Sequence, residues 1–213
     1  MVEGVDLLQV ELEGRDKEGN VFDSTKGEIA KKLHGKEGPL LLSLAHDRII
    51  KGLADALRGM KKGEERELEL SPSKAFGSRK KELVKIMSMA EFRKFAVNPE
   101  SGLLIHVDTD KGRTYGTVKS VSGGRVMVDF NHPLAGQPVT YRVKLVDVLT
   151  APEEKVRALC EHFGVAESWK LEDGKLTLKF KGGSGQDFEM AKSLLLVSLR
   201  VKVQGLKEIK VEK

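Results

Sequence analysis

The stretch Asn131-His132-Pro133-Leu134-Ala135-Gly136 decides the fold, because it interrupts two runs of alternating apolar and polar residues. Apolar side chains recur at every second position over 126–130 before it and over 139–145 after it. Period-two alternation is typical of half-buried strands. A polar hexamer that contains Pro and Gly is typical of a connection. The hexamer is therefore interpreted as a junction between two parts of the chain.

Length and composition limit what these parts can be. The chain has 213 residues, 39% hydrophobic and 32% charged, which is enough for two or three small cores. A single cysteine, Cys160, excludes an intramolecular disulfide, and no apolar run approaches the ~20 residues of a membrane span. We expect a cytoplasmic protein that has no membrane partner.

The net charge of +5 is unevenly distributed. Residues 78–132 carry more Lys and Arg than Asp and Glu, which favours an anionic partner such as ribosomal RNA. The alternative is an ordinary solvated surface. This alternative is favoured because no basic cluster with interleaved aromatic residues is present.

The first part of the chain is predicted to pack one helix on an antiparallel sheet. Residues 8–13 and 65–70 alternate as strands do, while the apolar residues of 47–60 recur at helical spacing. Gly59 follows the last of them and suits a left-handed helix end. We expect this to be the single short helix among these strands.

A second, β-rich unit is predicted before the hexamer. Ser88 and Glu91 match a capping box, so a short helix should start at Ser88. Residues 103–108, 114–121 and 125–129 then indicate a small meander of strands.

The residues after 150 indicate a third unit. Pro152 suits the first turn of a helix over 152–163, and a hairpin turn over 172–175 separates two strand patterns. A helix from Asp187 toward Gly205 and a last strand over 208–212 complete an α-β-β-α-β pattern.

Four motifs, in this order and spacing, carry a resemblance to a known family. The chain resembles the FKBP-type peptidyl-prolyl cis-trans isomerases in VFDST (21–25), IIKGLADALRGMKKGE (49–64) and AFG (75–77). The hexamer resembles the corresponding segment in the SlyD-like branch of this family. In that branch an insert-in-flap domain interrupts the isomerase domain. Residues after Ala151 resemble the C-terminal appendage of long archaeal members.

The resemblance implies an α+β chain in three parts. Residues 1–80 and 134–150 form an FKBP-like antiparallel sheet wrapped on a short helix. Residues 81–133 form a small β-rich insert with a chaperone role, and 151–213 form the α-β-β-α-β mini-domain. The implied partners are unfolded or proline-containing polypeptides, with the ribosome and a second copy, through the C-terminal domain, as further possibilities.

The implied chemistry is rotation of an X-Pro bond in an apolar pocket. Rotation is slow because amide resonance imposes a barrier of ~18–20 kcal/mol, and a catalyst needs no nucleophile, metal or cofactor to lower it. In the family pattern Asp23 is the polar member of the pocket and the Ile50 backbone amide is the donor to a substrate carbonyl. The apolar pocket positions are Phe22, Leu40, Ile49, Ile50, Leu53, Phe76 and Tyr141.

Two positions depart from the family pattern. Leu12 and Phe76 stand where the family usually has tyrosines. Because two hydroxyl groups are missing, we expect Asp23 to have too few hydrogen-bond partners. We also expect a weaker isomerase, since each hydrogen bond is worth roughly 0.5–1.5 kcal/mol. Without the motif order, each pocket residue would be interpreted as ordinary core.

An apolar cluster in the insert has two interpretations. It is either the core of the insert or a Met-containing surface that adapts to many unfolded segments. Its members are Leu83, Val84, Ile86, Met87, Met89, Phe92 and Phe95.

The five histidines are not spaced as metal ligands, and we assign His132 a structural hydrogen bond within the junction. Two alternatives to an isomerase remain open. One is a non-catalytic holdase with a degenerate pocket, and the other is a basic module associated with the ribosome or RNA.

Overall fold

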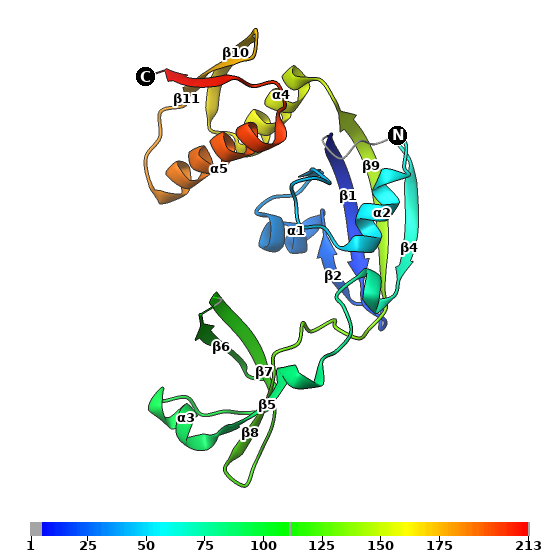
Figure 1. Cartoon of the computed structure of the whole chain (residues 1–213), viewed down its shortest axis with the longest axis vertical. Coiled ribbons are helices and arrows are strands. Elements are labelled where there is room, and N and C mark those ends of the chain that lie inside the picture. The colour runs from blue at the N-terminus through cyan, green and yellow to red at the C-terminus, as the bar shows by residue number, and fades with distance from the viewer. Residues whose placement is uncertain (1–5, 111, 213) are drawn as a thin grey trace. The chain divides into compact units, whose positions relative to one another are not determined.

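The computed structural model describes residues 6–110 and 112–212, which form two compact units (Figure 1). One unit combines the described residues up to 70 with those from 139 on, and the other consists of residues 71–138. Sheets and helices occur in both units, so the predicted α+β class is confirmed.

An antiparallel sheet built from both ends of a split sequence forms the centre of the first unit. In the described residues the sheet order is β2-β1-β9-β4, with β3 also paired to β1. Its longest strand, β9, runs between β1 and β4 and comes from the sequence after the hexamer (Figure 1). The strands are β1 (Leu7–Arg15), β2 (Val21–Ser24), β3 (Leu40–Leu42), β4 (Glu65–Leu70) and β9 (Val139–Leu149).

The register of β1 and β9 follows from their apolar faces. Val10 pairs with Leu145, and Leu12 pairs with Val143, and all four side chains are buried. A shift by one residue would turn these side chains to solvent, so burial fixes the register. The sheet closes only when β9 returns, which makes residues 71–138 an insertion into one continuous sheet.

Two helices accompany this sheet, α1 (Gly27–His34) and α2 (Lys51–Arg58), so the expectation of a single helix was wrong. Helix α1 begins after Lys26 without a side-chain cap and therefore lacks the usual sequence signal for a start. It buries Ala30 fully and ends at Gly35 with φ 77°. The left-handed end predicted for Gly59 was also wrong, because Gly59 has φ −93° and its carbonyl accepts from Arg66.

The second unit contains a four-stranded antiparallel sheet of order β5-β8-β7-β6 in the described residues. The capping box at Ser88 and Glu91 is confirmed. Phe92 packs with Val118, Val126 and Val128 in a small core. The elements are η1 (Pro72–Lys74), η2 (Lys81–Leu83), β5 (Val84–Ser88), α3 (Met89–Lys94), β6 (Leu104–Thr109), β7 (Gly112–Ser122) and β8 (Arg125–Asp129).

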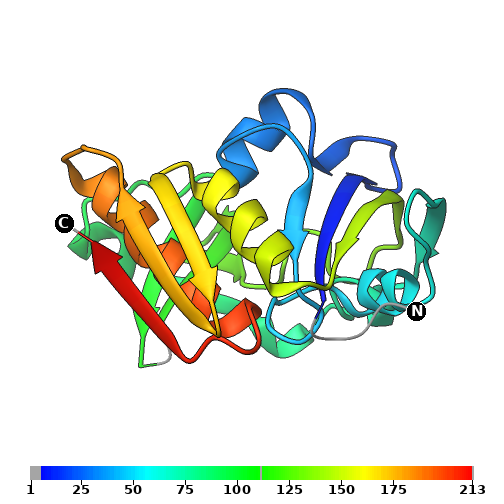
Figure 2. The ribbon, with the colours of Figure 1, turned by 90° about the horizontal axis from the view of Figure 1, so that it is seen from above.

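The C-terminal region has the predicted α-β-β-α-β order. Its helices lie on one face of a sheet of order β10-β11-β12 (Figure 2). The turn between β10 and β11 places Asp173 and Gly174 at positive φ, as a tight hairpin turn requires. The elements are α4 (Pro152–Phe163), β10 (Ala166–Glu172), β11 (Lys175–Phe180), α5 (Gln186–Lys202) and β12 (Glu208–Glu212).

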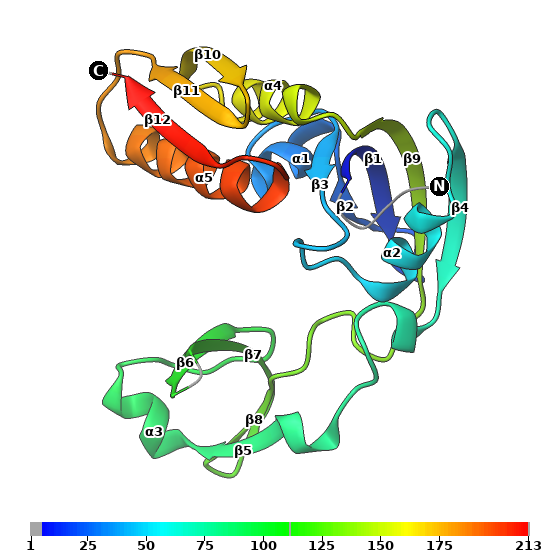
Figure 3. The same cartoon turned by 45° about the horizontal axis from the view of Figure 1, so that its top comes forward.

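The C-terminal core is continuous with the end of the first sheet. Leu7 of β1 and Leu149 of β9 belong to the same buried cluster as Leu159, Leu195 and Leu199 of the two helices. Strand β3 lies against α4 (Figure 3). In the part of the chain that the structure describes, no helix is both long enough and apolar enough to cross a membrane.

Candidate functional site

Two aromatic rings meet above a glycine on the inner face of the first sheet. Gly14 of β1 is paired with Asp23 of β2 on one side and with Tyr141 of β9 on the other. The rings of Phe22 and Tyr141 pack edge to face, with centroids 5.6 Å apart and an interplanar angle of 85°. A Cβ atom at Gly14 would lie 2.9 Å from atoms of both rings. The ring pair therefore depends on Gly14, a role that sequence reasoning missed.

Asp23 is the polar group beside these rings, and two donors hold it. The Tyr141 hydroxyl donates to Oδ2 at 3.3 Å, and His34 Nε2 donates to Oδ1 at 2.9 Å. Burial, together with the charge of Asp23, raises the pKa of Tyr141, so its hydroxyl stays protonated as a donor. The Asp23 side chain is 22% exposed, so a ligand can still reach it.

The expectation that Asp23 would be short of partners was therefore wrong. His34 supplies the second donor from the last turn of α1, eleven residues after Asp23. The sequence signal that would have found it is Gly35, because a left-handed glycine marks a helix end. With helix α1 predicted, His34 would have fallen on its final turn, beside β2.

The backbone of Leu12 anchors the loop that follows Asp23. The hydroxyl of Thr25 accepts from the Leu12 amide at 3.1 Å and donates to the Leu12 carbonyl at 3.2 Å. The Thr25 amide donates to that same carbonyl. Thr25 is 1% exposed, and the Leu12 side chain is buried on the inner face of β1. Leu12 thus holds the loop through its backbone groups. This role does not depend on the hydroxyl group that a tyrosine would carry at this position.

The other predicted pocket residues of this unit come from β3 and from the start of α2. Leu40 begins β3, opposite Val10. Ile49 and Ile50 are half-buried just before α2, and Leu53 is 4% exposed on its first turn. None of the described residues accepts a hydrogen bond from the Ile50 amide. The role of this amide as the donor to a substrate carbonyl stays a prediction.

The predicted pocket residue Phe76 belongs to the other unit. Its ring stacks on His132, with centroids 4.3 Å apart and planes within 3°. His132 Nδ1 accepts from the Leu134 amide at 3.2 Å, which confirms a structural hydrogen bond at this histidine. Burial lowers the pKa of His132, so the ring is neutral and accepts this bond.

The hexamer that includes His132 ties the entry of the insert to its exit. The side chain of Asn131 accepts from the Lys80 amide at 2.8 Å and donates to the Lys80 carbonyl at 2.9 Å. The Gly136 amide donates to the carbonyl of Gly77 at 2.8 Å. We call these contacts the staple.

The predicted insert residues divide between core and surface. Phe92 is 5% exposed, and Met87 and Met89 pack against the same core. Ile86 and Phe95 are 69% and 80% exposed. Leu83 and Val84 are half-buried.

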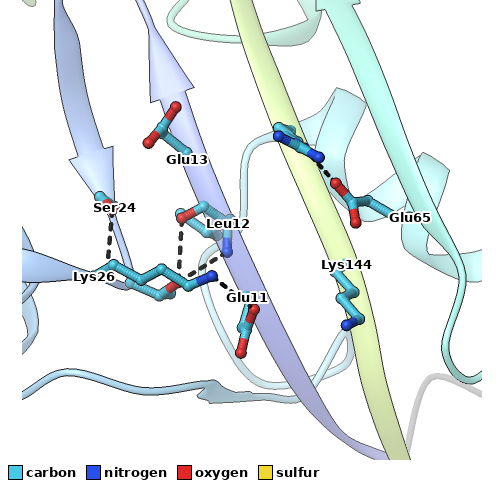
Figure 4. Close-up of a pocket in the computed structure, with 9 residues that line it drawn as sticks. Glu11, Leu12, Glu13, Ser24, Lys26, Glu65 and Lys144 are labelled. Atoms are coloured by element: carbon cyan, nitrogen blue, oxygen red, sulfur yellow. Dashed lines mark hydrogen bonds and ion pairs between the residues drawn. The ribbon is translucent and has the colours of Figure 1, made fainter.

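A charged hollow of about 240 Å³ lies on the sheet near Leu12 (Figure 4). Lys26 pairs with Glu11 at 3.3 Å, and Arg142 pairs with Glu65. Charged side chains lose hydration when an apolar proline ring covers them, so this hollow is a poor binding site for proline. The hollow shares Leu12 with the predicted pocket residues, and is lined by Glu11, Leu12, Glu13, Ser24, Thr25, Lys26, Glu65, Arg142 and Lys144.

Comparison with known proteins gives the family. Residues 2–102 match the FKBP-type peptidyl-prolyl cis-trans isomerases, and residues 85–134 match the IF domain of FKBP26. A probable FKBP-type 16 kDa peptidyl-prolyl cis-trans isomerase of Pseudomonas fluorescens is 32% identical over 112 residues, 53% of this chain and 74% of the relative. The chain belongs to the FKBP-type peptidyl-prolyl cis-trans isomerase family. This confirms the resemblance expected from the motifs.

Two further relatives of the FKBP-type chain come from different organisms. A short-type peptidyl-prolyl cis-trans isomerase of Methanocaldococcus jannaschii is 29% identical over 142 residues, 64% of this chain and 88% of the relative. The FKBP-type isomerase SlyD of Vibrio cholerae is 32% identical over 121 residues, 56% of this chain and 59% of the relative. Within residues 6–110 and 112–212, no three His, Cys, Asp or Glu side chains group as metal ligands would.

Proposed function

We propose that this chain rotates X-Pro bonds in unfolded polypeptides, which its insert binds. The observation that supports this most is the Phe22–Tyr141 ring pair with Asp23 held beside it by two donors. X-Pro bonds populate both isomers but exchange slowly, because amide resonance opposes rotation. Turnover requires a surface that binds the twisted amide better than either planar form.

Each group has a task in this proposal that involves no covalent step. The two rings cover the proline and exclude water from the amide. The twisted amide loses its resonance dipole, so an apolar wall disfavours it less than the planar forms. The Ile50 amide donates to a carbonyl of the bound chain and fixes its direction. Asp23, held by His34 and Tyr141, supplies a fixed carboxylate at the edge of the rings.

A proline-limited refolding assay tests this function. We expect wild type to accelerate refolding at substoichiometric concentration and Asp23→Ala to lose most of that acceleration. Asp187→Ala, at an exposed position on α5, is the matched control and should behave as wild type. If wild type merely suppresses aggregation at stoichiometric concentration, the chain is a holdase and catalysis is excluded.

The holding of clients is supported by the outer face of the insert sheet. Ile86 of β5 and Met127 of β8 are cross-strand partners, and they are 69% and 39% exposed. Leu104 and Tyr115, on β6 and β7, add further exposed apolar surface. Strand β5 is an edge of this sheet in the described residues, so a client backbone can pair with it.

We also propose that this chain is a weaker catalyst than relatives that have tyrosines at the positions of Leu12 and Phe76. Phe76 lacks the hydroxyl that would bond a substrate, and the residue is only half-buried. Phe76→Tyr should raise kcat/KM by roughly two- to tenfold, the worth of one hydrogen bond. An unchanged kcat/KM would remove Phe76 as the cause of weak activity.

A second copy is the partner we propose for α5. Met190, Leu194, Val197 and Val201 are 43–58% exposed and recur at alternating spacings of four and three, as in a helix–helix seam. The first turn of α5 is acidic and its last turn is basic, so an antiparallel pair of α5 helices brings opposite charges together.

The reducing, cytoplasmic location expected from the lone Cys160, which is buried, also remains a proposal.

A further inference from the structure

The segment between α1 and α2, residues 35–50, contributes three of the predicted pocket residues, namely Leu40, Ile49 and Ile50. Helix α2 starts after Ile50 without a side-chain cap, so the direction of the Ile50 amide depends on the turn that precedes it. That turn is closed by the amides of His46 and Asp47, which both donate to the Ser43 carbonyl. Whatever holds this turn therefore sets where the amide points.

The C-terminal region contacts this segment at two places before the turn. The ammonium group of Lys36 donates to the carbonyl of His162, at the end of α4. Leu41 of β3 packs against the C-terminal core. Both contacts fall on one continuous stretch of the pocket segment. The C-terminal region therefore supports the first part of the segment, around β3 (Figure 3).

The third contact reaches the turn itself. Lys202, in the last turn of α5, donates to Asp47 Oδ2 at 2.8 Å. The same oxygen accepts from the Ser43 amide at 2.7 Å, and Ser43 is fully buried. The Lys202 side chain is 14% exposed and that of Asp47 is 27% exposed. This ion pair is thus better shielded from water than an ordinary surface pair.

We propose that Lys202 is a positioning residue for the isomerase site, and that the C-terminal domain thereby contributes to turnover. The inference rests on the proposed function, because it needs Ile50 to bind the substrate. Lys202 fixes the Asp47 carboxylate, the carboxylate fixes the Ser43–Asp47 turn, and the turn sets the Ile50 amide three residues later. Small misplacements of binding groups have large effects on turnover, because catalysis depends on prearranged geometry.

Full-length Lys202→Met, Lys202→Arg and Arg200→Met variants test the proposal. Arg200→Met removes an exposed cation two residues away on the same helix and is the matched control. On a short proline peptide, Lys202→Met should lower kcat roughly threefold to tenfold with little change in KM. Lys202→Arg should stay within about twofold of wild type, and Arg200→Met should be unchanged.

A measurement independent of turnover is the ¹H–¹⁵N signal of the Ile50 amide. It should shift in Lys202→Met and stay in place in Arg200→Met. An unshifted Ile50 signal, or wild-type kcat in Lys202→Met, would overturn the proposal while the proposed function stands. A wild-type chain without turnover would overturn both together.

Discussion

His34 Nε2 lies 2.9 Å from Asp23 Oδ1, so a histidine on a helix whose start carries no sequence signal holds the acidic group of the predicted site. The two side chains are comparably shielded, at 21% and 22% exposure. A hydrogen bond to a charged, partly buried carboxylate is stronger than one between neutral groups. The orientation of Asp23 therefore depends on α1 as well as on Tyr141.

Replacing His34 should release Asp23 from α1. We expect His34→Ala to lower kcat/KM for a proline peptide by roughly tenfold to a hundredfold, the worth of one hydrogen bond to a charged group. His34→Gln keeps a donor and should recover part of the loss, while exposed Lys32→Ala should have no effect. In Asp23→Ala, adding His34→Ala should cost nothing further. Additive losses would show that the two residues act separately.

Gly14 should tolerate no side chain, because the two rings already fill the space above it. Gly14→Ala places a Cβ at 2.9 Å from the Phe22 and Tyr141 rings. Overpacking of this kind costs about 1 to 3 kcal/mol of stability, and the displaced rings should lower kcat/KM as well. Urea unfolding and a peptide assay measure the two effects. Gly182→Ala, with nothing within 4 Å of its Cβ, is the control, and equal behaviour of both variants would contradict the prediction.

The insert should separate client binding from peptide turnover. Ile86→Ser and Phe95→Ser remove exposed apolar surface, so they should weaken suppression of client aggregation yet leave turnover of a short peptide unchanged. Lys85→Ser, exposed on the same strand, is the control. Phe92→Ala should instead destabilise the insert by about 3 to 5 kcal/mol, since Phe92 is core. Full aggregation suppression by both serine variants would place client binding elsewhere.

His162 should make the stability of the C-terminal region sensitive to acid. Burial, helped by the charges of Lys36 and Lys202, lowers the pKa of His162 to about 4. In the unfolded chain this pKa is roughly 6.5, so between these values the unfolded state binds more protons. The free energy of unfolding should therefore fall as the pH drops from roughly 6.5 toward 4. In urea unfolding, the free energy of unfolding of His162→Gln should fall less over this pH range than that of wild type. Exposed His106→Gln should match wild type. Identical pH profiles for all three proteins would refute the prediction.

The exposed stripe of α5 should determine the oligomeric state. Leu194→Glu puts a charge in the centre of the proposed seam, so it should give a monomer at concentrations where wild type is a dimer. Ser193→Glu, exposed beside it, should leave the dimer intact. Sedimentation velocity distinguishes the two. A monomeric wild type would end the proposal of a second copy.

Sequence reasoning reached the elements whose signals are local. Residues 88–91 carry a capping box and residues 172–175 a hairpin turn, and both features are present. Helix α1 was missed because Lys26 offers no cap and the tertiary burial of Ala30 stabilises it instead. The roles of Gly14 and His34 were missed for a related reason. Gly35 could have marked the end of α1 and so placed His34 on its last turn, but the contacts of His34 with Asp23 and of Gly14 with the two rings form between elements that meet only after folding.

The staple makes the inserted segment an exchangeable cassette. Asn131 bonds both backbone groups of Lys80, so the two ends of residues 81–130 are held close together. A guest module therefore has only to offer two neighbouring ends, whatever it carries between them. Evolution or an engineer can therefore replace the cassette, while the strands that surround Asp23 keep their sequence.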